Sequence, residues 1–134
     1  RARQSVFLHN VIQNKDAEYA ADDVRFRLVL VHIPFTEKFE KQFDIENARY
    51  DEWASMLRRI NPDLMVCGHM HRMYVSMPGC VRDARGQACP VVVASKPERN
   101  NFSGAALTLR PGEADVRFTD AFGAVSFSET LHLK

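Results

Sequence analysis

Three histidines follow predicted buried strands, where their imidazoles could bind a metal ion. His32 comes directly after the apolar run of residues 28–31, and His69 and His71 come after a second run that ends at Gly68. Imidazole is among the commonest protein ligands for zinc, iron and related ions near neutral pH. Two histidines separated by one residue can contribute to one ion or to two neighbouring ions. Taken without the rest of the chain, His69 and His71 could also be polar loop residues that bind no metal.

Two strands and a helix are expected to position these histidines. Residues 25–31 begin with alternation and end in a continuous apolar run, which predicts a strand that becomes fully buried. Residues 47–60 carry an apolar stripe at helical spacing, and residues 63–67 predict a second buried strand. The stripe consists of Trp53, Met56, Leu57 and Ile60, with Tyr50 close to it. A strand, a helix and a strand in this order predict a crossover between parallel strands, so the three histidines should lie at one edge of a sheet.

The remaining segments predict a mixed α/β fold. Residues 4–20 predict a helix that frays toward residues 14–16, and His9 on it is expected to be an ordinary surface or packing histidine. After His71, short strand-like runs alternate with turn-forming pairs such as Pro-Gly, which predicts antiparallel meanders in a second sheet or at the flank of a mixed one. The runs are residues 73–77, 90–95, 104–109, 115–118 and 124–131. His132, between two leucines in the last run, is expected to face solvent.

The segment between the first strand and the helix carries three regularly spaced aromatic residues. Phe35, Phe39 and Phe43 are four residues apart. This spacing favours one or two helical turns that pack on the core. A mobile lid over a site is the alternative.

The three cysteines do not form a disulfide framework, because they are few and odd in number. Cys67 is expected to be a small buried hydrophobic residue within its strand. Cys80 and Cys89 flank a turn-like stretch. If the chain forms a hairpin about residues 84–85, a disulfide between them is geometrically possible, and free thiols are at least as well supported.

Composition restricts the classes of function. The 134 residues are 46% apolar and 26% charged, which is typical of one globular, soluble domain with a core of its own. The formal net charge of +1 gives no case for a nucleic-acid or membrane-surface partner, and no apolar run approaches the roughly 18 residues of a membrane span. The chain starts at Arg1 without an initiator Met, so we expect a segment of a longer protein or a processed product. Its compartment stays open, with the cytoplasm slightly favoured.

The order and spacing of these elements resemble the C-terminal half of calcineurin-like metallophosphoesterases. The similarity consists of a strand followed by His-Ile-Pro at residues 28–34, a helix with Trp53 and Leu57, and a strand followed by Gly-His-Met-His at residues 63–71. It covers roughly residues 25–75. The resemblance implies that residues 1–134 are one partial domain, the second half of a four-layer αββα sandwich in which parallel strands are followed by an antiparallel meander.

The resemblance also implies a two-metal site that hydrolyses phosphate esters. His32 and His69 match ligands of the second metal, and His71 matches a ligand of the first. Manganese, iron or zinc ions would all suit such a site. Two ions about 3.5–4 Å apart clamp a phosphate ester and activate a hydroxide for in-line attack.

Other motifs of that family are absent from the sequence. It contains no Asp-x-His, no Gly-Asp to supply the bridging carboxylate and no Gly-Asn-His. Three imidazoles assigned to two ions cannot hold a dinuclear site, so the chain alone is expected to bind metal weakly or at one ion and to hydrolyse esters poorly, while the parent protein is the enzyme. The alternatives are a mononuclear zinc hydrolase that uses all three histidines and a non-catalytic interaction module. Arg72 is interpreted as a solvated loop charge in preference to a substrate contact.

Because the resemblance covers only the second half of the domain, we expect the chain to self-associate. In the resembled fold the two halves share one core, so a lone half leaves a strand edge and an apolar face uncovered. Such surfaces favour pairing with another chain. We therefore expect a dimer in which each copy covers the other.

Overall fold

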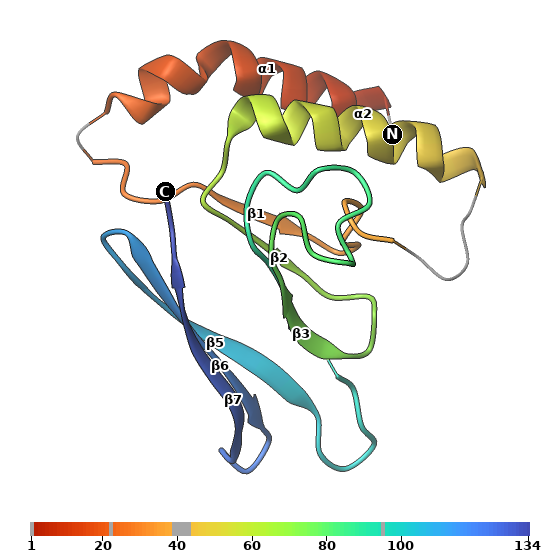
Figure 1. Cartoon of the computed structure of the whole chain (residues 1–134), viewed down its shortest axis with the longest axis vertical. Helices are drawn as coiled ribbons and strands as arrows, with labels where there is room; N and C mark the ends of the chain where they lie inside the picture. Colours follow the sequence, from red (N-terminus) through yellow and green to blue (C-terminus); the bar gives the residue numbers. More distant parts are fainter. Residues whose placement is uncertain (1, 22, 39–43, 95) are drawn as a thin grey trace.

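The computed structural model describes residues 2–21, 23–38, 44–94 and 96–134, and places them in a mixed α/β fold with two helices and two sheets (Figure 1). The helices are α1 (Ala2–Tyr19) and α2 (Asp44–Ile60). The strands are β1 (Leu28–Val31), β2 (Leu64–Cys67), β3 (Met73–Ser76), β4 (Val91–Ala94), β5 (Ser103–Arg110), β6 (Glu113–Asp120) and β7 (Val125–His132). Neither described helix is both long and apolar enough to cross a membrane.

The first sheet contains the expected parallel crossover. β1 and β2 pair in parallel through α2, with Leu28 opposite Leu64. The strand order is β1-β2-β4-β3, so β4 lies between β2 and β3 and is parallel to β2. β4 is also antiparallel to β3, with Ser76 opposite Val91, which confirms the predicted antiparallel flank of a mixed sheet. Its parallel pairing with β2 was not predicted. Its three consecutive valines are at most 1% exposed, as is typical of a central strand covered on both faces.

The second sheet is the expected antiparallel meander. Its order is β5-β6-β7, and β5 and β6 are joined by Pro111 and Gly112, with Gly112 at a φ of 75°. Glycine adopts this left-handed conformation without the steric cost of a Cβ atom. His132 at the end of β7 is exposed, which confirms that prediction.

The first sheet lies between two apolar cores. Both helices cover one of its faces, and the second sheet lies against the other (Figure 1). Alternate side chains of β2 and β4 therefore enter different cores. Met65 and Val93 pack on the helical side, whereas Leu64 and Val92 pack against the second sheet.

The edge strand β1 is not fully buried, contrary to the prediction. Val29 and Val31 pack on the helical core. Leu28 and Leu30 point to the other face and are 37% and 77% exposed. The second sheet covers that face at β2, β4 and β3 but does not include β1 in its core. The apolar sequence of β1 thus predicts a strand but not its burial.

Both helices occur where the periodicity predicts them. The stripe on α2 is buried or half-buried, with Leu57 and Ile60 in the helical core. α1 continues to Tyr19 without fraying at residues 14–16. The Tyr19 hydroxyl lies 2.6 Å from the Ile60 carbonyl oxygen and 2.8 Å from that of Asn61, and its single proton is shared between them, which anchors this end of α1. His9 is exposed on α1, as expected for a surface histidine.

The segment after β1 packs on the core without forming helical turns among its described residues. Phe35 is buried against Tyr50 and Trp53. The backbone then turns, and Glu37 forms an isolated bridge with Asp83. Core packing of Phe35 is confirmed, helical turns at residues 35–38 are not, and Phe39 and Phe43, on which the lid interpretation depends, lie outside the described residues.

The loop between β3 and β4 keeps its cysteines apart. β3 and β4 pair antiparallel across the long loop of residues 77–90, so Cys80 and Cys89 lie in that loop and not on facing strands. Cys80 and Cys89 are free thiols, and Cys67 is buried as predicted. Burial raises the pKa of both Cys67 and Cys89 to about 12. These two thiols are therefore neutral and unreactive at physiological pH.

Candidate metal centre

Two of the three predicted histidines meet at the ends of neighbouring strands. His32 Nε2 lies 3.2 Å from His69 Nδ1, and the rings are nearly perpendicular with their centroids 5.0 Å apart. The parallel register of β1 and β2 brings them together, because Val31 is opposite Cys67. The Gly68 amide donates to the His32 carbonyl at 3.0 Å, which joins the two chains beyond the strand ends.

The loop that follows β2 bends at its histidines. His69 has a φ of 66° and His71 a φ of 52°, both in the left-handed region that side chains other than glycine rarely adopt. Such residues cost on the order of 1–3 kcal/mol and occur preferentially at functional sites. The bend turns the chain back, and the ring of His69 comes to lie beside that of His32.

The distance between the two nitrogens fits a shared metal ion. Zinc–imidazole bonds are about 2.0–2.1 Å, so two nitrogens on one ion are about 2.9 Å apart at octahedral angles and about 3.4 Å apart at tetrahedral angles. The observed 3.2 Å lies between these values. The same distance fits a direct hydrogen bond between two neutral imidazoles, one as donor and one as acceptor. Both side chains are exposed, so a solvated ion can reach them.

The third histidine does not join this pair. Among the described residues, no group of three or more His, Cys, Asp and Glu side chains could hold an ion together, so His71 does not form a single ion site with His32 and His69. His71 is exposed, as is Arg72 beside it, in agreement with a solvated loop charge at Arg72. The chain thus assembles two nitrogen ligands. Further ligands of an ion bound there would be water or groups from outside the described residues.

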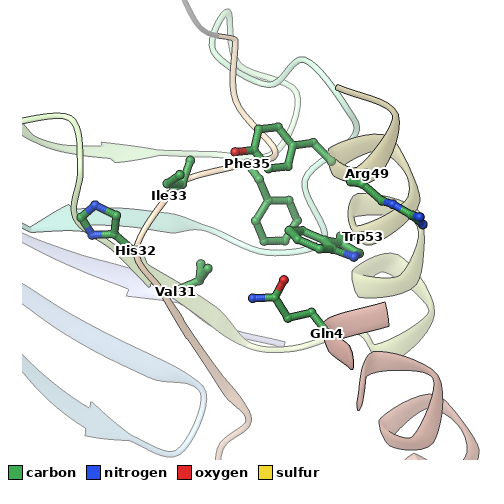
Figure 2. Close-up of a pocket in the computed structure, with 8 residues that line it drawn as sticks. Gln4, Val31, His32, Ile33, Phe35, Arg49 and Trp53 are labelled. Carbon is green, nitrogen blue, oxygen red and sulfur yellow. The ribbon is translucent and has the colours of Figure 1, made fainter. Parts of the chain in front are cut away.

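A pocket that the sequence did not predict lies beside His32. It has a volume of about 370 Å³ and lies between the end of β1, α2 and the start of α1 (Figure 2). The lining residues are Gln4, Val31, His32, Ile33, Phe35, Arg49, Tyr50 and Trp53. Tyr50 and Trp53 on α2 were the sequence signal for this pocket, but the sequence predicted only a packing role for them.

The segment after β1 also contains a buried carboxyl group, Glu37, that the sequence did not predict. Glu37 is fully buried, and Tyr74 Oη donates to its Oε2 atom at 2.7 Å. Burial raises the pKa of Glu37, and the hydrogen bond from Tyr74 partly opposes that effect. The Arg82 guanidinium lies 4.2 Å from the centroid of the Tyr74 ring. Because the Lys38 amide also donates to the Arg82 carbonyl, this cluster ties the segment after β1 to the loop between β3 and β4.

Comparison of the chain with protein-family models and with curated proteins found no match. The central observation is the pair of imidazoles, His32 and His69, at the carboxyl ends of two adjacent parallel strands. In open α/β sheets this is the edge at which ligands bind.

Proposed function

We propose that this chain supplies metal ligands to a phosphate-ester hydrolase of the calcineurin-like metallophosphoesterase type. The observation that carries the proposal is the 3.2 Å separation of His32 Nε2 and His69 Nδ1. Two further features support the proposal. The motifs occur in the order of that family, and β1 and β2, which precede the two histidine motifs, pair in parallel. On this proposal, residues 1–134 are the second half of a four-layer αββα sandwich.

The roles of the histidines follow from their chemistry. His32 and His69 would hold one manganese, iron or zinc ion, and His71 would serve a second ion together with carboxylates that the described residues do not bring to it. Bound ions would supply Lewis-acid activation of water and neutralisation of phosphate charge. Neutral imidazoles leave the positive charge of an ion uncompensated, which suits an anionic ester. The chain by itself would bind at most one ion and turn over esters poorly.

Removal of either paired histidine should weaken metal binding. His32→Ala and His69→Ala should each lower the affinity for Zn²⁺ by about tenfold or more, since each removes one of two ligands. His71→Ala should have a smaller effect on the same ion. Isothermal titration calorimetry of the 134-residue chain would measure both affinity and stoichiometry.

His9→Ala is the matched control, because it removes an exposed histidine on α1. Equal losses in His9→Ala and His32→Ala would contradict a defined centre. Absence of Zn²⁺ binding in the unmodified chain would favour the non-catalytic interaction module. Two tightly bound ions per chain together with phosphodiesterase turnover would contradict the incomplete site.

We also propose that the chain self-associates through β1. β1 is an edge strand, and Leu30 on its uncovered face is 77% exposed. The exposed Val6 and Phe7 add apolar surface on α1. An unpaired strand edge beside uncovered leucines favours pairing with a second copy.

Leu30→Lys should shift the chain toward monomer, because it places a charge on the face to be covered. Sedimentation-velocity centrifugation over a range of concentrations would measure the shift, with an expected weakening of the dimer by about tenfold or more. Val81→Lys is the control, because Val81 is 94% exposed on the loop between β3 and β4. A clean monomer at high concentration in the unmodified chain would contradict the proposal.

A further inference from the structure

The loop between β3 and β4 lies against the segment that carries His32. The Lys38 amide donates to the Arg82 carbonyl at 2.8 Å, and the Ala84 amide donates to the Thr36 carbonyl at 3.1 Å. These hydrogen bonds join two backbones that are more than forty positions apart in the sequence. The loop therefore contributes directly to the position of the segment that follows β1.

Arg85 provides the side-chain part of this contact. Its Nη1 atom donates to the carbonyl of Phe35 at 3.2 Å and to that of Glu37 at 2.9 Å. Its Nε atom donates to Asp51 Oδ1 of α2 at 2.8 Å. The side chain of Arg85 is 9% exposed, whereas that of Asp51 is 67% exposed. Hydrogen bonds from a charged donor are stronger than neutral ones, so the guanidinium is well suited to hold both carbonyls in place.

The stretch between these carbonyls and His32 is short and constrained. Pro34 has a ring that fixes its φ near about −65°. The Phe35 amide donates to the Ile33 carbonyl at 2.8 Å, which closes a tight turn around the proline. Phe35 is itself buried. A displacement of the Phe35 carbonyl is therefore transmitted to His32, because the two residues between them have little freedom to absorb it.

The ring of His32 depends on its backbone for its position. Its side chain is exposed, so core packing does not hold the ring. His69 comes from a different strand end, and the two ring nitrogens are 3.2 Å apart. Side chains of a metal site must be held within about 0.5 Å of the binding geometry. The pair therefore keeps its spacing only if the segment after β1 stays in place.

We propose that Arg85 is a positioning residue for the candidate metal centre, because it holds the segment that carries His32 and so keeps the ring of His32 beside that of His69. The proposal rests on the proposed function only where it describes the two histidines as a metal centre. The position of the two rings can be measured without metal.

Arg85→Met removes the guanidinium donors and keeps most of the apolar stem. In the metal-free chain, NMR of the ring nitrogens should show shifted resonances for His32 and His69, because the contact between Nε2 and Nδ1 is weakened. The resonances of His9 and His132 should not move, since both are exposed on other elements. The affinity for Zn²⁺, measured by calorimetry, should fall by about threefold to tenfold.

Two control variants separate this role from ion pairing and from general stability. Asp51→Asn removes the charge that faces Arg85 from α2 and leaves the donors to the two carbonyls in place. Val116→Ala removes buried apolar contacts in the core against the second sheet. Neither change should shift the resonances of His32 and His69 or alter the affinity for Zn²⁺.

Arg85→Lys is a second, milder variant at the same position. It keeps the positive charge but lacks the planar fork of donors. It should shift the same two histidine resonances and lower the affinity for Zn²⁺ by less than Arg85→Met does. If Arg85→Met does not fold, the comparison of Arg85→Lys with the two controls decides the question.

The outcomes distinguish this inference from the proposed function. Unchanged resonances of His32 and His69 and unchanged Zn²⁺ affinity in the folded Arg85 variants would overturn the positioning role and leave the metal centre intact. Shifted resonances in a chain that binds no Zn²⁺ would support the positioning of the rings and overturn the proposed function. Equal shifts in Val116→Ala would mean that general loss of stability moves the rings, and equal shifts in Asp51→Asn would mean that the ion pair with α2 does so. Either result would overturn the role assigned to the carbonyl contacts of Arg85.

Discussion

Replacement of Leu64 by alanine should lower the free energy of unfolding by about 2–5 kcal/mol. Leu64 is fully buried in the core between the two sheets, where Val92, Val116 and Leu131 are also buried. Truncation removes apolar contacts and leaves a cavity that the paired strands cannot close by moving. Urea denaturation followed by circular dichroism would measure the loss.

Leu30→Ala is the matched control on the same face of the same sheet. Leu28 lies opposite Leu64, and Leu30 is the next residue of β1 on that face. Because Leu30 is exposed, the same truncation should change stability by no more than about 0.5 kcal/mol in dilute solution. Equal losses for Leu64→Ala and Leu30→Ala in dilute solution would mean that β1 is covered like β2, contrary to the fold described.

Tyr74→Phe should destabilise the chain by about 1.5–3 kcal/mol at pH values above the folded-state pKa of Glu37, the usual value of a hydrogen bond to a charged group. The change removes the donor to Glu37 Oε2 and leaves a buried carboxylate without it. Phenylalanine keeps the ring face over which Arg82 lies, so that contact is retained. Burial raises the pKa of Tyr74, so its hydroxyl is a protonated donor over the whole range of the measurement.

The cost of Tyr74→Phe should depend on pH. The pKa of Glu37 is raised in the folded state by burial, so its contribution to stability is present below the ordinary carboxyl pKa and is lost as pH rises through the folded value. Removal of the Tyr74 donor raises the folded-state pKa of Glu37 further. The variant therefore loses more stability than the unmodified chain as the pH rises. The cost should therefore fall toward about 0.5–1.5 kcal/mol at acid pH, the value for a neutral hydrogen bond.

Denaturation curves from acid pH to above the folded-state pKa of Glu37, in both the native and the Glu37→Gln background, would show whether ionisation of Glu37 causes the pH dependence. In the Glu37→Gln background the cost of Tyr74→Phe should no longer vary with pH, because the residue at position 37 cannot ionise. A cost with the same pH dependence in both backgrounds would show that another group is responsible. Arg82 and Asp83 are the charged neighbours whose fields also act on Glu37.

Local patterns were sufficient to predict the elements that bring His32 to His69. The helical stripe of α2 between two apolar runs predicts a parallel crossover, because such a connection has few packed alternatives. Strand direction alone then places the two histidines at one edge, and the structure confirms their proximity. No such pattern specifies the path of the loop after His69, and within the described residues His71 does not complete a site for one ion with His32 and His69.

Features that depend on distant partners could not be predicted. The valines of β4 indicate a buried strand but do not identify its neighbours, so its parallel pairing with β2 was missed. The exposure of Leu30 depends on how far the second sheet extends, which the sequence of β1 does not encode. Glu37 lies in a segment whose aromatic spacing indicates core packing of Phe35 but gives no sign of a buried carboxyl group, and its backbone bridges to Asp83 in a distant loop. The pocket combines α1, β1 and α2, and no single stretch of sequence reveals it.

The position of β4 has a consequence for how fast the chain folds. No neighbouring pair in the first sheet is joined by a tight turn: Leu28 pairs with Leu64, Met65 with Val91, and Ser76 with Val91 across a long loop. Each pairing requires closure of an intervening segment before the strand contacts offset the lost chain entropy. Proteins dominated by such non-local contacts cross their folding barrier slowly. The β5–β6 and β6–β7 hairpins are local contacts, so we expect them to form before the sheet that carries His32 and His69.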